Sequence, residues 1–117
     1  MVPFEYLTRQ DYEAALAAYR ELRQKRLGGR FTSEQELNRL GYELMNNDQL
    51  DLAVDIFRIN VDLYPASSNV YDSLGEAYLK QGDKALAAKY YQKSLQLDPD
   101  NKNALKILKE LGVVAKS

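Results

Sequence analysis

Residues 68–101 read SNVYDSLGEAYLKQGDKALAAKYYQKSLQLDPDN, and a similar pattern occupies the stretch directly before them. When residues 34–67 are written above residues 68–101, leucine, glycine, alanine and proline fall on their own kind without a gap. The identical pairs are Leu40 and Leu74, Gly41 and Gly75, Leu52 and Leu86, Ala53 and Ala87, Leu63 and Leu97, and Pro65 and Pro99. A fixed period of this length is typical of a protein built from stacked structural repeats.

Each repeated unit is predicted to form two helices. In the first unit, apolar residues recur three or four positions apart from Leu37 to Leu44 and again from Leu50 to Val61. This spacing is that of amphipathic helices. The proline near the end of each unit stops the second helix, because proline disfavours helical geometry in the residue before it.

Polar residues mark where these helices begin. Asp48 and Asp83 lie between the two helices of their units, and we expect both to accept backbone N–H bonds at the start of the second helix. Ser33 and Glu36 have the spacing of a capping box, which predicts a helix start at the first unit.

A glycine stands inside the first helix of each unit, where it costs about 1 kcal/mol relative to alanine. We predict that Gly41 and Gly75 let the first helix approach an alanine of the second, Ala53 or Ala87, while an aromatic residue fills the space one turn later.

This order of residues resembles the tetratricopeptide repeat. The first unit carries it in Leu37, Leu40, Gly41, Leu44, Ala53, Phe57 and Pro65, and the second in Tyr71, Leu74, Gly75, Tyr78, Ala87, Tyr91 and Pro99. Asn60 and Ser94 depart from it late in the second helix, which weakens the expectation of close packing there. The resemblance implies an all-α fold, a right-handed α-α superhelix of antiparallel helix pairs with flanking capping helices.

The flanks are predicted to complete the array, because a single repeat cannot bury its apolar face alone. Residues 102–117 are interpreted as a C-terminal capping helix that Gly112 ends, after the repeats 34–67 and 68–101. Residues 1–33 are interpreted as an N-terminal helix and loop, with residues 9–26 forming the second helix of a partly lost repeat. Six helices are therefore expected. Gly28-Gly29-Arg30 is interpreted as a turn after the N-terminal helix.

The composition excludes most catalytic chemistry. The 117 residues include no histidine and no cysteine, which removes Ser-His-Asp triads, Cys-His pairs, zinc sites of these ligands and disulfides. We therefore expect no catalytic residue, no metal and no cofactor. The net charge of −1 gives no general attraction to nucleic acid.

No membrane partner is expected either, because no apolar run approaches the roughly 20 residues of a membrane span. No secretory signal is visible in Met1 to Tyr6. The default expectation is a cytoplasmic protein, unless the chain comes from a longer exported one.

The resemblance implies a non-catalytic scaffold that binds a peptide or protein segment on its concave face. Aligned with the family, the residues lining that face are Gln35, Asn38, Arg39, Tyr42, Met45, Asn46, Asn69, Asp72, Ser73, Glu76, Leu79, Lys80, Asn103, Lys106 and Glu110. Tyr42 and Met45 are apolar residues that the core stripe does not need, so we predict that they contact the partner. The chaperone-clamp variant of the family is disfavoured, because Asn38, Tyr42 and Ser73 stand where its Lys and Asn set would begin.

Charge is distributed unevenly. Residues 31–79 carry two basic and nine acidic side chains, and residues 80–117 carry eight basic and four acidic ones. The acidic middle either selects a basic partner or serves as an ordinary soluble surface. The basic cluster of Arg20, Arg23, Lys25, Arg26 and Arg30 is interpreted as favourable charge at a helix end rather than a nucleic-acid or membrane site.

A second resemblance concerns the partner. The order of AALAAYREL at 14–22, Phe31 to Glu34, LNRLGY at 37–42 and VYDSLGEAY at 70–78 is similar to the C-terminal repeat tails of some bacterial serine hydrolases, of the esterase and β-lactamase-like types. It implies a hydrolase domain in the same full-length chain as the partner. The alternatives are a self-associating homo-oligomeric module and a small enzyme that uses surface carboxylates such as Asp72 and Glu76.

Overall fold

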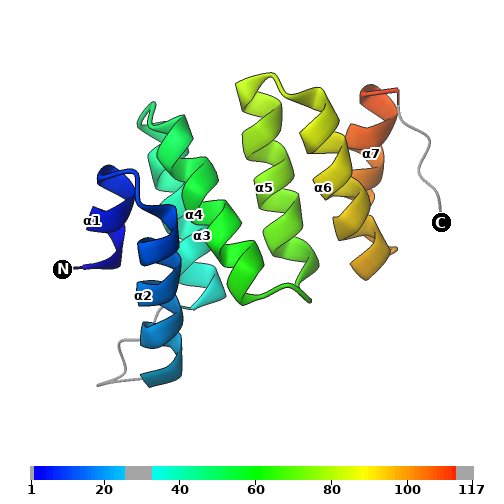
Figure 1. Ribbon diagram of the computed structural model, residues 1–117. Coiled ribbons are helices and arrows are strands. Elements are labelled where there is room, and N and C mark those ends of the chain that lie inside the picture. The colour runs from blue at the N-terminus through cyan, green and yellow to red at the C-terminus, as the bar shows by residue number, and fades with distance from the viewer. Residues whose placement is uncertain (1, 26–32, 113–117) are drawn as a thin grey trace. The chain divides into compact units, whose positions relative to one another are not determined.

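The computed structural model describes residues 2–25 and 33–112. Within these residues it contains seven α-helices and no strand. The helices are α1 (Pro3–Thr8), α2 (Tyr12–Lys25), α3 (Glu34–Asn46), α4 (Leu50–Leu63), α5 (Ser68–Gln81), α6 (Lys84–Leu97) and α7 (Lys102–Glu110). The helices α3 and α4 pack as one pair and α5 and α6 as another (Figure 1), which confirms the predicted all-α fold of helix pairs.

The chain divides into two compact units, Met1–Leu63 and Tyr64–Ser117. In unit 1, α1 packs on α2, and both contact α4. The Tyr12 hydroxyl of α2 donates a hydrogen bond of 2.7 Å to Asp62 of α4, and the Arg58 guanidinium lies 4.3 Å from the centre of the Tyr12 ring. These contacts fix α2 against α4.

The N-terminal region holds one helix more than predicted. The helix predicted within residues 9–26 is present as α2, but α1 precedes it. The helix α1 has six residues, and because the described residues already contain seven helices, the expectation of six is wrong. Pro3 begins α1 at a position where its missing N–H leaves no bond unmade, and Leu7 is buried.

Some predictions fall outside the residues that the structure describes. The turn at Gly28-Gly29-Arg30 lies there, as does Arg26. The side chains of Arg23 and Lys25 in the basic cluster are likewise not described.

One type of turn joins the two helices of all three pairs. In each turn a residue in the left-handed region follows the first helix: Gln10 at φ 61°, Asp48 at φ 61° and Gly82 at φ 86°. The next N–H then donates to the carbonyl five residues earlier, from Asp11 to Tyr6 at 2.8 Å, from Gln49 to Leu44 at 2.9 Å and from Asp83 to Tyr78 at 3.0 Å. This bond is typical of the Schellman ending of a helix. Asp48 and Gly82 are 34 residues apart, so the period of the two repeats is visible in backbone geometry as well as in sequence.

The cap predicted at Asp83 is confirmed, and the one at Asp48 is wrong. Oδ1 of Asp83 accepts a bond of 3.1 Å from the N–H of Leu86. With a period of 34 residues, Asp48 corresponds to Gly82 rather than to Asp83, so it takes the left-handed position and precedes the capping position. The Ser33 cap is confirmed, since its hydroxyl accepts a bond of 3.1 Å from the N–H of Glu36.

The glycines inside α3 and α5 face the aromatic rings of the following helices. A Cβ on Gly41 would overlap the ring of Phe57, and one on Gly75 would lie 3.0 Å from the nearest atoms of the Tyr91 ring. Both rings are almost fully buried. Each glycine therefore makes room for a ring of the following helix.

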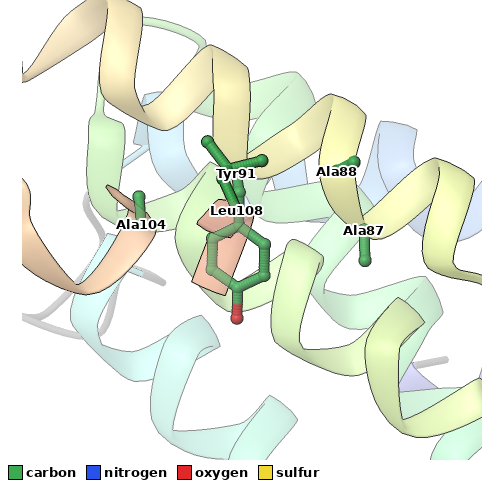
Figure 2. Close-up of a cluster of buried hydrophobic side chains, with 5 residues drawn as sticks. All are labelled: Ala87, Ala88, Tyr91, Ala104 and Leu108. Atoms are coloured by element: carbon green, nitrogen blue, oxygen red, sulfur yellow. The ribbon is translucent and has the colours of Figure 1, made fainter. Parts of the chain in front are cut away.

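The core of unit 2 extends from α6 to α7. Ala87, Ala88 and Tyr91 of α6 form a buried cluster with Ala104 and Leu108 of α7 (Figure 2). The helix α7 thus covers an apolar face of α6. Its start is capped by Asn101, whose side chain accepts a bond of 3.1 Å from the N–H of Ala104.

Close packing is kept at Asn60 and Ser94, although their polar side chains depart from the repeat pattern. Both are 0% exposed. Asn60 donates a bond of 3.0 Å to the carbonyl of Glu34, and Ser94 donates one of 2.8 Å to the carbonyl of Ser68. The two acceptors are the first residues of α3 and α5. These equivalent bonds tie the second helix of each pair to the beginning of the first.

Candidate protein-binding surfaces

The residues predicted to bind a partner lie on α3 in unit 1 and on α5 and α7 in unit 2. Exposed among them are Gln35, Arg39, Asn46, Asn69, Lys80, Asn103, Lys106 and Glu110. Half-buried are Asn38, Tyr42, Asp72, Glu76 and Leu79, whereas Met45 and Ser73 are buried.

Met45 and Ser73 were predicted to line the binding surface, and the structure corrects this. Their exposed fractions are 8% and 2%, so neither offers its side chain to a partner. Tyr42 contacts Phe57 edge to face, with ring centres 5.2 Å apart. Met45 is therefore used in packing, whereas the half-buried Tyr42 packs on Phe57 and its contact with a partner stays a prediction. The signal was in the sequence, because Met45 lies four residues after Gly41 and so shares its helix face.

Arg39 lines a shallow depression between α2 and α3 in unit 1. The depression measures about 250 Å³, and its lining includes Tyr19, Glu36 and Glu43. Two carboxylates thus accompany the single cation, which gives this hollow no marked charge of the kind that would select a cationic or an anionic partner.

In unit 2 the structure brings residues of α5 and α7 together. The amide of Asn103 donates a bond of 3.4 Å to Oδ2 of Asp72. Glu76 lies one helical turn after Asp72 on α5. Two carboxylates of α5 and an amide of α7 therefore share one surface, which we call the acidic face.

Asp72 is the unusual group of the acidic face. Its Oδ1 is buried and accepts no hydrogen bond from the residues that the structure describes. Burial raises the pKa of the Asp72 carboxyl above its ordinary value, hydrogen bonds from Asn103 and Asn101 oppose the rise, and the charge of Glu76 adds to it. A cation placed beside this half-buried carboxyl group would favour its ionised form.

Unit 2 has a depression of its own, which was not predicted from the sequence. It measures about 430 Å³ and is lined by Tyr71, Lys89, Tyr90, Gln92, Lys93 and Gln96. Lys89 and Lys93 are four residues apart on α6, which was the available signal.

Other kinds of site were sought in the part of the chain that the structure describes. Nowhere in it do three or more Asp, Glu, His or Cys side chains gather in a way that could hold a metal ion. None of its helices combines the length and the apolar character needed to cross a membrane.

Comparison with known sequences agrees with the repeat pattern. Residues 68–101 match the family model of the tetratricopeptide repeat. The chain is 33% identical over 98 residues to the tetratricopeptide repeat domain-containing protein PYG7 of Arabidopsis thaliana, a chloroplastic protein. The match covers 84% of this chain but only 33% of PYG7, so the chain spans about a third of the length of that relative. A chloroplastic relative lends no support to the default expectation of a cytoplasmic protein.

Solved structures share the fold. MamA has a TM-score of 0.62 and 21% identity, and the match covers 95% of this chain and 63% of MamA. The first tetratricopeptide repeat unit of Spaghetti (RPAP3), bound to the HSP90 peptide SRMEEVD, has a TM-score of 0.65 and 17% identity, covering 94% and 84%. The N-terminal domain of stress-induced protein-1 from C. elegans has a TM-score of 0.61 and 19% identity, covering 95% and 89%. The fold is that of tetratricopeptide-repeat proteins.

Proposed function

We propose that this chain is a non-catalytic protein-binding module, and that its acidic face binds a basic segment of a partner protein. The observation that carries the proposal is a pair of half-buried carboxylates one helical turn apart on α5, Asp72 and Glu76, with Asn103 of α7 bonded to Asp72. The fold supports the class of function, since the Spaghetti structure of the same fold holds a peptide.

Partial burial makes the negative charge of Asp72 costly to the folded chain, and it raises the pKa of this carboxyl. A lysine or arginine side chain of a partner would offset that cost by pairing with the charge. Arginine fits best, because its planar guanidinium donates two parallel bonds to a carboxylate. Glu76, one turn away on α5, supplies a second carboxylate for the same segment.

Substitution of the acidic face tests the proposal. Random 12-residue peptides are selected on the intact chain, and the affinity of the selected peptides is measured by fluorescence anisotropy. We expect the selected peptides to be rich in Lys and Arg. The double variant Asp72→Asn with Glu76→Gln should lower their affinity about tenfold. The control variant Glu43→Gln with Asp100→Asn loses the same charge at two exposed positions and should stay within about twofold.

Charge reversal provides a stronger form of the same test. Asp72→Lys with Glu76→Lys should abolish capture of the basic peptides and leave the helix content unchanged in circular dichroism. The proposal is overturned if the wild-type chain and both acidic-face variants bind the selected peptides equally.

The identity of the partner remains a prediction of the sequence. The resemblance to hydrolase tails implies that the partner is a hydrolase domain of the same full-length chain. The similar proteins described above are not hydrolases by name. Sequencing the full-length gene tests that partner. Self-association is tested by sedimentation at several protein concentrations, where a constant mass would exclude the homo-oligomer under those conditions.

A further inference from the structure

The depression in unit 2 has a rigid aromatic wall. The Tyr90 ring of α6 stacks on two rings of α5, Tyr71 at 6.3 Å and Tyr78 at 5.5 Å between ring centres, with interplanar angles of 18° and 17°. The Tyr71 hydroxyl donates a bond of 2.9 Å to the carbonyl of Pro65, which holds the outer end of that ring. A partner would therefore find these rings already ordered.

Two lysines stand over this wall. The Nζ atom of Lys89 lies 5.5 Å from the centre of the Tyr90 ring, and the Nζ atom of Lys93 lies 6.0 Å from the centre of the Tyr71 ring. Neither lysine forms an ion pair with a residue that the structure describes. Like charges four residues apart on a helix repel each other, so anionic groups placed beside them would relieve that repulsion.

We propose that this surface, which we call the lysine–tyrosine face, binds an acidic segment of a partner protein. One carboxylate of the segment lies at Lys89 and another at Lys93, and an apolar side chain between them packs into the hollow beside Tyr90. The amides of Gln92 and Gln96, which also line the depression, are available to the backbone of the segment.

The stacking geometry favours a protein segment over a nucleic acid. Single-stranded nucleic acids bind proteins by stacking bases on exposed aromatic faces and by contacts of many cations with phosphates. Here Tyr90 is already stacked against Tyr71 and Tyr78, and the depression contains two cations. Paired carboxylates on a short peptide match this limited charge.

The lysine–tyrosine face is separate from the acidic face and selects the opposite charge. It uses α6 and the side of α5 that carries Tyr71, whereas the acidic face uses Asp72 and Glu76 of α5 with α7. The inference therefore does not depend on the proposed function.

A defined peptide tests the inference. Fluorescein-labelled Glu-Glu-Leu-Glu-Glu and its neutral counterpart Gln-Gln-Leu-Gln-Gln are titrated against the intact chain at low salt, up to about 1 mM, and followed by anisotropy. We expect saturable binding of the acidic peptide and binding of the neutral one that is weaker by about tenfold. Amide chemical shifts in the isotope-labelled chain should change most at residues 89–96.

Matched variants assign the binding to this face. The double variant Lys89→Gln with Lys93→Gln should lower the affinity for the acidic peptide about fivefold or more. Lys102→Gln with Lys109→Gln removes the same charge from two exposed lysines of α7 and should stay within about twofold. Asp72→Asn with Glu76→Gln should leave this peptide bound, which separates the test from that of the acidic face.

Four results would overturn the inference. The first is the absence of saturable binding of the acidic peptide. The second is that the chemical-shift changes lie mainly outside residues 89–96. The third is that the two lysine variants lose the same affinity for the acidic peptide. The fourth is tighter binding of a ten-residue oligothymidylate that Lys89→Gln with Lys93→Gln abolishes, which would assign the face to nucleic acid.

Discussion

At Gly41 and Gly75 the chain gives up helix stability to accommodate a ring. Alanine would gain about 1 kcal/mol in helix propensity at either position. Its Cβ would overlap Phe57 at the first position but lie 3.0 Å from Tyr91 at the second. We expect Gly41→Ala to lower the free energy of unfolding by about 1–3 kcal/mol and Gly75→Ala to change it by less than about 1 kcal/mol. Urea denaturation of both variants measures this, and a larger loss for Gly75→Ala would contradict it.

The turn residues Asp48 and Gly82 hold the same left-handed conformation with different side chains. A Cβ on Gly82 would meet no atom within 4 Å, so alanine there bears only the backbone cost of that conformation, about 1–2 kcal/mol. We expect Gly82→Ala to lower the free energy of unfolding by roughly that amount, and Asp48→Gly to leave it unchanged or raise it. Thermal unfolding tests the pair. An unchanged midpoint for Gly82→Ala would show that the turn relaxes.

At the scale of elements, the bond between Ser94 and Ser68 joins more than two helices. The Ser94 hydroxyl also accepts a bond of 2.9 Å from the Asn101 side chain, which caps α7. Removing the hydroxyl with Ser94→Ala should therefore cost about 1 kcal/mol and loosen the start of α7. Hydrogen exchange at the amide of Ala104 should become faster.

The control for this bond is an exposed one. Thr8 donates a local bond of 2.7 Å to the carbonyl of Glu5, and Thr8→Ala should change the free energy of unfolding by less than about 0.5 kcal/mol. Equal effects of the two substitutions, or unchanged exchange at Ala104, would show that Ser94 does not support α7.

The helices that the sequence predicted best are those with a long apolar period. Residues 34–101 contain four such helices, and all four are present with the expected turns between them. The helix α1 could not be predicted in this way, because six residues are too few to show a period. The bonds of Asn60 and Ser94 were also hidden, since their acceptors are backbone carbonyls 26 residues earlier.

The candidate sites, too, could be predicted only where the sequence pattern reveals the contact. Alignment with the family selected both Asp72 and Asn103 for one surface, and the structure joins them by a hydrogen bond. The lysine–tyrosine face escaped prediction because it depends on Tyr90 of α6 stacking on rings of α5, and no spacing within one helix reveals that contact. Burial of Met45 was readable from its helix face but was attributed to partner contact instead.

At the scale of the whole molecule, unit 2 presents two surfaces of opposite charge. The acidic face lies on α5 and α7, and the lysine–tyrosine face lies beside α5 on α6. A partner bound at one face would leave the side chains of the other accessible, because the two share no residue. A mixture of the basic and acidic probe peptides should therefore bind the chain together, and competition between them would indicate that the faces are coupled.

The titration behaviour of the molecule follows from its composition. Without histidine or cysteine, no side chain has an ordinary pKa between about 5 and 10. Burial raises the pKa of Tyr19 to about 12. Burial raises the pKa of Tyr12 as well, and its hydrogen bond to Asp62 adds to the rise. Stability should therefore change little between about pH 7 and 9 and fall at higher pH.

The sign of this fall follows from proton binding. In the unfolded chain a tyrosine loses its proton near pH 10, whereas folded Tyr19 keeps its proton to about pH 12. Between these values the unfolded state binds fewer protons, so rising pH favours unfolding. We expect Tyr19 alone to account for about 1–3 kcal/mol of the loss. Urea denaturation of the wild-type chain and of Tyr19→Phe at pH 7, 9, 10 and 11 measures the difference. Phenylalanine has no proton to lose, so the variant should lose stability less steeply above pH 10, and equal slopes would show that Tyr19 titrates alike in both states.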